Sequence, residues 1–224
     1  MLKELGRKIK VIICDLDQTL LNSQKQISQN NLEAIRAAQA KGIFVTICSG
    51  RIFTMLETYA RDLSIEGPLI STNGAALVDC PGGKILASHP IERQTALQIL
   101  ENAAINDFDY AALTPTACYF SANSIRVQRF LQYNEIASAQ GMVTIPIRYL
   151  DGFHDQIEGS IFKILIQQLI TGDLEKASVF LNEISGISVT NSEEGLLDVM
   201  KAHVDKGTGV VELRDFLGVE KAEV

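Results

Sequence analysis

Two carboxylates stand two residues apart directly after a short apolar run. Asp15 and Asp17 follow Val11–Cys14, which is rich in β-branched side chains and is typical of a strand buried on both faces. Carboxylate oxygens suit Mg²⁺, and a pair at this spacing can share one hard dication together with carbonyl, water and phosphate oxygens. Two aspartates can also cap or form a turn, so the pair alone leaves both interpretations open.

Polar clusters also follow the next two apolar runs. Ile43–Cys48 leads into Ser49–Arg51, and Leu69–Ile70 leads into Ser71–Gly74. Between the first two runs, Ser28 can cap a helix that ends near a glycine. Strand, helix and strand in succession predict a parallel sheet with right-handed crossovers. All three polar clusters should therefore meet at the carboxyl edge of the strands, where open α/β sheets bind ligands.

The pattern changes after the glycine-rich turn near residue 82, and from about Ser88 a second α/β module is predicted. We expect a core domain over residues 1–87 and 195–224, with an insert over residues 88–194. Leu196–Met200 is expected to be a strand that leads back to the core. Within the insert the pattern predicts helices over 95–104, 124–139 and 173–184 and strands over 110–113, 117–121, 161–167 and 187–190.

Composition narrows the classes of function. The chain has 224 residues, of which 46% are hydrophobic and 21% charged, as in ordinary globular proteins. A net charge of -7 with scattered Lys and Arg argues against nucleic acid as a partner. No run reaches the roughly 20 apolar residues of a bilayer span, so we expect no membrane partner. Four cysteines without a CxxC pair favour a reducing compartment and a cytoplasmic protein.

Four motifs in order carry a family resemblance. Asp15-Leu16-Asp17-Gln18-Thr19-Leu20-Leu21, Ser49-Gly50-Arg51, Asn73-Gly74-Ala75 and Leu197-Asp198-Val199-Met200-Lys201-Ala202-His203-Val204-Asp205-Lys206-Gly207 resemble the haloacid dehalogenase (HAD) superfamily, in its Cof-like branch of sugar-phosphate and small-metabolite phosphatases. The resemblance implies an α/β fold with a doubly wound, parallel-sheet, Rossmannoid core and an inserted α/β cap domain.

The resemblance also implies roles for individual residues. Asp15 would be the nucleophile that forms an aspartyl-phosphate. Asp17 would be the general acid and base, which requires it to hold a proton while Asp15 is ionised. Both aspartates would bind Mg²⁺. Ser49, Gly50 and Lys206 would bind the phosphoryl oxygens, where charge gathers in the transition state.

Arg51, Asn73 and Gly74 are weaker candidates for contact with the substrate. Turn chemistry explains Asn73 and Gly74 almost as well. Three further residues lie in no nucleophile or metal-ligand spacing and are expected to be ordinary core or surface histidines: His89, His154 and His203.

The chain departs from the family at its end. The family's fourth motif is an acidic Gly-Asp cluster followed by Asn-Asp, and neither occurs after the helix expected over Gly207–Gly218. We therefore expect a truncated chain whose last core strands are missing. The strand that carries Asp15 would then have an uncovered edge, and self-association through that edge is expected.

The expected function is Mg²⁺-dependent hydrolysis of a small phosphate monoester, either a sugar phosphate or a similar metabolite, with impaired activity in this truncated chain. An alternative is a catalytically silent phosphate-binding or interaction domain, and a phosphomutase is a further one. The substrate partner would be a small phosphorylated metabolite.

Overall fold

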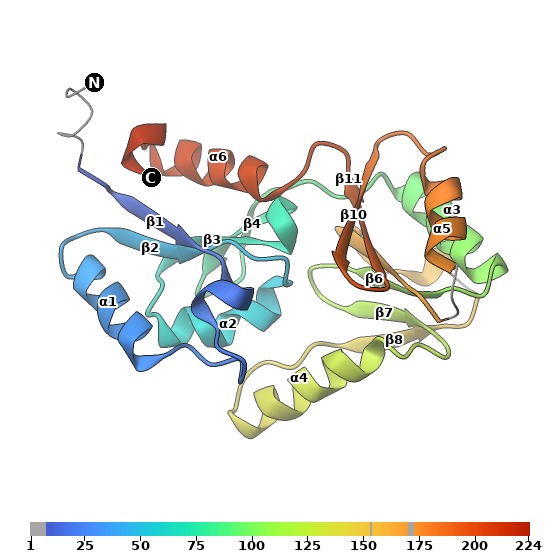
Figure 1. The fold of residues 1–224 in the computed structure, drawn as a ribbon, viewed down its shortest axis with the longest axis horizontal. Coiled ribbons are helices and arrows are strands. Elements are labelled where there is room, and N and C mark those ends of the chain that lie inside the picture. The colour runs from blue at the N-terminus through green and yellow to red at the C-terminus, as the bar shows by residue number, and fades with distance from the viewer. Residues whose placement is uncertain (1–7, 153, 170–172) are drawn as a thin grey trace. The chain divides into compact units, whose positions relative to one another are not determined.

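The structure is a computed structural model that describes residues 8–152, 154–169 and 173–224. The chain forms two compact units. Unit 1 consists of the residues up to Ser88 together with Asp205–Val224, and unit 2 consists of His89–Val204. Both units are mixed α/β (Figure 1).

Unit 1 is built on parallel pairing near its amino terminus. Its strands are β1 (Val11–Cys14), β2 (Phe44–Ile47), β3 (Gly67–Ser71), β4 (Ala76–Cys80) and β5 (Ile85–Ser88). β1 and β2 are parallel, and a parallel bridge between Cys48 and Ile70 joins the end of β2 to β3. β4 and β5 then add antiparallel strands. The predicted α/β class with parallel strands is confirmed. Unit 1 also contains the two antiparallel strands β4 and β5.

The helices of unit 1 are α1 (Gln29–Gln39), α2 (Phe53–Asp62) and α6 (Lys206–Leu217). Figure 1 shows α6 on one side of the unit 1 strands and α1 and α2 on the other. The predicted cap of the first helix is confirmed, because the Ser28 hydroxyl accepts from the Asn31 amide at 3.2 Å. Leu213 of α6 is fully buried against Val11, Ile70 and other apolar side chains, which fixes α6 on the sheet.

Among its described residues, unit 2 contains one six-stranded sheet and three α-helices. In order across the sheet, its strands are β10 (Ile187–Glu193), β11 (Leu196–Lys201), β9 (Lys163–Gln167), β6 (Asp109–Leu113), β7 (Cys118–Ser121) and β8 (Ile147–Leu150). Its helices are α3 (Arg93–Ile105), α4 (Val127–Ala139) and α5 (Asp173–Leu181). Ile99, Tyr110, Ile164 and Leu181 lie in the apolar core between one face of this sheet and the helices α3 and α5.

Both predicted boundaries of the insert differ from those of the structure. Leu196–Met200 was expected to lead back to the core domain, but β11 lies between β10 and β9 and pairs antiparallel with both. Pairing on both edges places this strand inside unit 2. Unit 1 therefore resumes at Asp205 and not at residue 195, and the first boundary lies after Ser88 and not after residue 87.

Within the described residues, no helix is both long and apolar enough to span a bilayer.

Candidate active site

The loops after β2 and β3 meet, as the sequence predicts for strand ends at one edge of a sheet. The Asn73 amide donates to the Ser49 carbonyl at 2.9 Å, and the Thr72 amide donates to the Arg51 carbonyl at 2.8 Å. The loop after β1 is adjacent because the Cys48 amide donates to the Cys14 carbonyl at 2.9 Å. These main-chain bonds hold the polar residues after all three strands on neighbouring loops.

Asp15 and Lys206 form an ion pair. The Lys206 Nζ lies 2.7 Å from Asp15 Oδ2, and Asp15 Oδ1 accepts from the Leu16 amide at 2.7 Å. Lys206 is the first residue of α6, whose N-cap Asp205 accepts from the Thr208 amide at 2.8 Å. The predicted nucleophile and the predicted phosphate-binding lysine are therefore in direct contact at the start of a helix, a position that favours anions.

Two glycines allow α6 to approach the loop after β3. A Cβ at Gly74 would lie 2.0 Å from the Asp205 carbonyl oxygen, and a Cβ at Gly209 would lie 2.5 Å from Ile70 Cγ2. Gly74 also has a φ of 94°, in the left-handed region that side chains disfavour. Gly74 therefore packs against the start of α6 and positions it, and its expected contact with the substrate stays a prediction.

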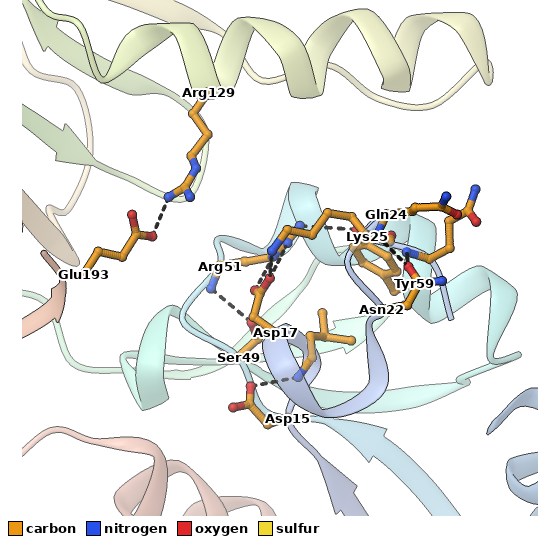
Figure 2. Close-up of polar contacts among 12 residues, drawn as sticks. Asp15, Asp17, Asn22, Gln24, Lys25, Ser49, Arg51, Tyr59, Arg129 and Glu193 are labelled. Atoms are coloured by element: carbon orange, nitrogen blue, oxygen red, sulfur yellow. Dashed lines mark hydrogen bonds and ion pairs between the residues drawn. The ribbon is translucent and has the colours of Figure 1, made fainter. Parts of the chain in front are cut away.

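Asp17 is held by two cations. Arg51 Nε donates to Asp17 Oδ2 and Arg51 Nη2 to Oδ1, both at 2.9 Å, and Lys25 Nζ donates to Oδ1 at 2.8 Å (Figure 2). Arg51 in turn lies over the ring of Tyr59, 5.3 Å from its centroid. The side chain of Arg51, which was predicted to reach the substrate, contacts the second aspartate of the site.

The charge state of Asp17 differs from the expectation. The hydrogen bonds from Arg51 are the main reason why the pKa of Asp17 is lowered, and Lys25 adds to this effect while partial burial opposes it. The lowered pKa favours the ionised form of Asp17, whereas the general-acid role implied by the resemblance requires a proton. The guanidinium beside the carboxylate is the physical reason for the difference.

Lys25 is a site residue that the sequence analysis missed. It lies at a five-residue turn between Leu21 and Ile27, which form an antiparallel bridge. The Asn22 side chain accepts from the Gln24 and Gln26 amides at 2.9 and 3.0 Å, and Lys25 has a φ of 59°. The Tyr59 hydroxyl donates to the Lys25 carbonyl at 3.2 Å. The polar residues between Leu21 and Ile27 indicate a turn in the sequence, but they do not indicate that the side chain of Lys25 points toward Asp17.

Ser49, Gly50 and Asn73 pack closely. Ser49 is buried, with 1% of its surface exposed, and its hydroxyl accepts from the Arg51 amide at 3.3 Å. A Cβ at Gly50 would lie 2.7 Å from Asn73 Oδ1, so any other residue would require the Asn73 side chain to move. Asn73 has a φ of 53°, which fits the turn interpretation.

The oxygen atoms at this site suit Mg²⁺ in kind. The Asp15 carboxylate and the main-chain carbonyl of Asp17 are hard ligands, and the Asp17 side chain is committed to cations. Among the described residues, no group of three or more Asp, Glu, His or Cys side chains could hold a metal ion.

His154 is buried, and its Nε2 lies 2.7 Å from the Tyr110 hydroxyl in unit 2, which agrees with the expected core role.

The fold and the site together define an α/β enzyme class in which a strand-end aspartate faces a lysine at the start of a helix. Residues 12–224 match the haloacid dehalogenase-like hydrolase family, so the chain belongs to that family of hydrolases. The resemblance found in the sequence is confirmed.

Individual relatives agree with this assignment. The chain is 27% identical to 5-amino-6-(5-phospho-D-ribitylamino)uracil phosphatase YwtE of Bacillus subtilis, over 96% of this chain and 80% of that protein. It is 34% identical to phosphatase YwpJ of the same organism, over 56% of this chain and 46% of that protein. A solved haloacid dehalogenase-like hydrolase from Bacteroides thetaiotaomicron superposes with a TM-score of 0.80 at 25% identity, covering 97% of this chain and 80% of that one.

Proposed function

We propose that the protein is a Mg²⁺-dependent phosphatase that hydrolyses a small phosphate monoester, a sugar phosphate or similar metabolite, through an aspartyl-phosphate on Asp15. The observation that carries the proposal is the contact between Asp15 and Lys206 at the start of α6. This contact supports the proposal because a carboxylate that could attack phosphorus lies beside a cation that could take the charge of a phosphoryl group. The phosphatase names of the relatives support the same class.

In the first step, an Asp15 carboxylate oxygen forms a bond to phosphorus as the bond from phosphorus to the ester oxygen breaks. Lys206 and the Ser49 hydroxyl donate to the phosphoryl oxygens, together with the main chain at Gly50. The leaving alkoxide takes a proton from the Asp17 carboxyl group. In the second step, water loses a proton to Asp17 and attacks phosphorus, which frees Asp15 and inorganic phosphate.

Arg51 and Lys25 hold Asp17 as a carboxylate, so they must release it, and it must take up a proton from solvent, before it can protonate a leaving group. A phosphoryl group brings negative charge that competes for both cations. We infer that substrate binding moves at least one of them from Asp17 to the substrate, which would give Arg51 the substrate contact expected from the sequence.

Asp15 and Asp17 would hold the Mg²⁺, Asp15 through its carboxylate. When bound, the ion supplies Lewis-acid stabilisation of the phosphoryl charge.

We further propose a cytoplasmic location, which is supported by four free thiols at Cys14, Cys48, Cys80 and Cys118. A small phosphorylated metabolite is the proposed partner.

Self-association through β1 stays a prediction. Among the described strands, β1 pairs only with β2, and the Lys10 amide before it donates to the Glu223 carbonyl at 2.8 Å. Light scattering over a range of protein concentrations tests it.

The function is tested with the purified chain, Mg²⁺ and a panel of sugar phosphates and p-nitrophenyl phosphate. We expect turnover that is lost on chelation and in Asp15→Asn, and a phosphoryl adduct on the peptide that contains Asp15. Absence of turnover for every ester with retained phosphate binding would indicate the silent binding domain instead. Retention of the phosphoryl group on an organic product would indicate a phosphomutase.

A further inference from the structure

Two arginines at the start of α4, the N-cap Arg126 and Arg129 of the first turn, converge on one carboxylate in unit 2. Arg129 Nη1 donates to Glu193 Oε1 at 2.5 Å, as Figure 2 shows, and Arg126 Nη1 donates to Glu193 Oε2 at 3.3 Å. The Arg126 side chain is 14% exposed, whereas those of Arg129 and Glu193 are 52% and 44% exposed. Glu193 is therefore accessible, while one of its two partners is mostly enclosed by protein.

Two buried polar atoms at the start of α4 have no hydrogen-bond partner among the described residues. They are Arg126 Nε and Ser124 Oγ, and Ser124 is only 7% exposed. A buried donor without an acceptor costs roughly 1–3 kcal/mol, so native proteins rarely keep one without a ligand, an ion or a water to satisfy it. Both atoms lie in the same turn, which locates the unfilled hydrogen-bonding capacity at the start of α4.

Asp109 holds the main chain of this turn but does not satisfy those atoms. Its buried carboxylate accepts from the Ile125 and Arg126 amides at 2.9 and 3.2 Å and from the Ser121 hydroxyl at 2.9 Å. These three bonds fix the backbone from which Ser124 and Arg126 project. The backbone of this turn is therefore fixed by Asp109, whereas the side chains of Ser124 and Arg126 keep hydrogen-bonding atoms that have no partner among the described residues.

A purely structural role, in which Arg126, Arg129 and Glu193 only link α4 to β10, does not explain these contacts well. Exposed ion pairs contribute little to stability, because ordering two long side chains offsets the Coulombic gain. Each guanidinium offers five donors, and the bonds to Glu193 use one from each arginine. Partial burial alone would raise the pKa of Glu193, but the hydrogen bonds from Arg129 and Arg126 outweigh it and keep the carboxylate ionised. Glu193 resembles a counter-ion in a site with capacity for more acceptor oxygens.

We propose that Ser124, Arg126 and Arg129 form an oxyanion site on unit 2, which takes a carboxylate or phosphate group of a small metabolite. Glu193 is its resting counter-ion, which the ligand displaces from one or both arginines. Two planar guanidinium groups and a hydroxyl match the several acceptor oxygens of such an anion. The site does not rest on the proposed phosphatase activity, because none of its residues belongs to that chemistry.

The site is tested by NMR of the arginine Nε–Hε groups in the full ¹⁵N-labelled chain, titrated with malonate and separately with inorganic phosphate at constant ionic strength. We expect a saturable shift of the Arg126 Nε–Hε resonance. Arg129→Gln should weaken this binding about tenfold, and Glu193→Gln should strengthen it severalfold. Arg148 is the matched control, since it pairs with Glu158 at 3.1 Å on the same unit and its side chain is 50% exposed.

An Arg126 resonance that no anion moves would mean that water satisfies the buried donors, and the proposal would fail. Equal shifts at Arg126 and Arg148 would show general charge screening and would also overturn it. An unchanged affinity in folded Arg129→Gln would have the same effect.

A second arm identifies the source of the anion. The ratio of kcat/KM for 3-phosphoglycerate to that for glycerol 3-phosphate compares two esters that differ by a carboxylate in place of a hydroxymethyl group. If the anionic group belongs to the substrate, Arg129→Gln should lower this ratio about tenfold and Arg148→Gln should not. An unchanged ratio with intact NMR binding assigns the site to a free anion. If neither ester is turned over, the phosphatase proposal is in question while the titration still tests the site.

Discussion

The guanidinium of Arg51 holds the carboxylate of Asp17 at both oxygens, at 2.9 Å each. A planar fork of this kind fixes the orientation of the carboxylate as well as its charge. Arg51 is itself held by the Tyr59 ring, and its side chain is only 17% exposed. The second aspartate of the site is thus set in place by a residue that follows the neighbouring strand.

Arg51→Met should raise the pKa of Asp17 toward the ordinary aspartate value of about 3.9. Because the folded-state pKa is lowered in the wild type, the stabilisation is fully present above the unfolded value and is lost as pH falls through the folded one. The stability difference between wild type and Arg51→Met should therefore be constant above about pH 5 and shrink below about pH 4. ¹³C NMR titration of the Asp17 carboxyl and urea unfolding at several pH values measure both effects. A pKa that is unchanged in the variant would contradict the assigned cause.

Lys25→Met should lower kcat about tenfold, because the phosphoryl group loses one of the two cations that we propose can move to it from Asp17. Lys10→Met is the matched control. Lys10 pairs with Glu223 at 2.8 Å, and its side chain is 55% exposed against 57% for Lys25. Steady-state kinetics on the preferred ester measure the difference. Equal kinetics for the two variants would remove Lys25 from the site, whereas Lys25→Arg should restore most of kcat.

Gly74→Ala should destabilise the protein by at least about 2 kcal/mol, since the new Cβ would meet the Asp205 main chain and the left-handed backbone is strained. Gly42→Ala separates the two effects. Gly42 has a φ of 76° with nothing within 4 Å of its Cβ position, so only the backbone cost of about 1–2 kcal/mol applies. Equal losses in urea unfolding would show that the close approach of α6 is not limiting.

Lys163→Met should cost about 3–5 kcal/mol of unfolding free energy, because Asp198 loses its cationic partner inside unit 2. The two side chains are 8% and 1% exposed. Lys163→Met combined with Asp198→Leu should recover much of the loss. Arg148→Met, which breaks an exposed pair, should cost no more than about 1 kcal/mol. A double variant as unstable as the single one would contradict this account.

Much of unit 1 could be predicted from short stretches of sequence. The apolar run at Val11 predicted a strand, Ser28 predicted the start of a helix, and polar residues marked the carboxyl ends of three strands. These features depend on neighbours within one element, where periodicity and capping act. In unit 2 the same reasoning found β6, β7 and β9 but not β8, whose Arg148 and Tyr149 interrupt the apolar pattern.

The sequence by itself determined the family, the α/β class and the two carboxylates after the first strand. Tertiary structure decided the remaining relationships: β11 pairs on both edges within unit 2, Lys206 reaches Asp15, and Arg51 and Lys25 keep Asp17 charged. The reason is physical. Strand pairing and side-chain direction depend on segments that are distant in the chain, and the charge of a carboxylate depends on the cations that such packing brings to it.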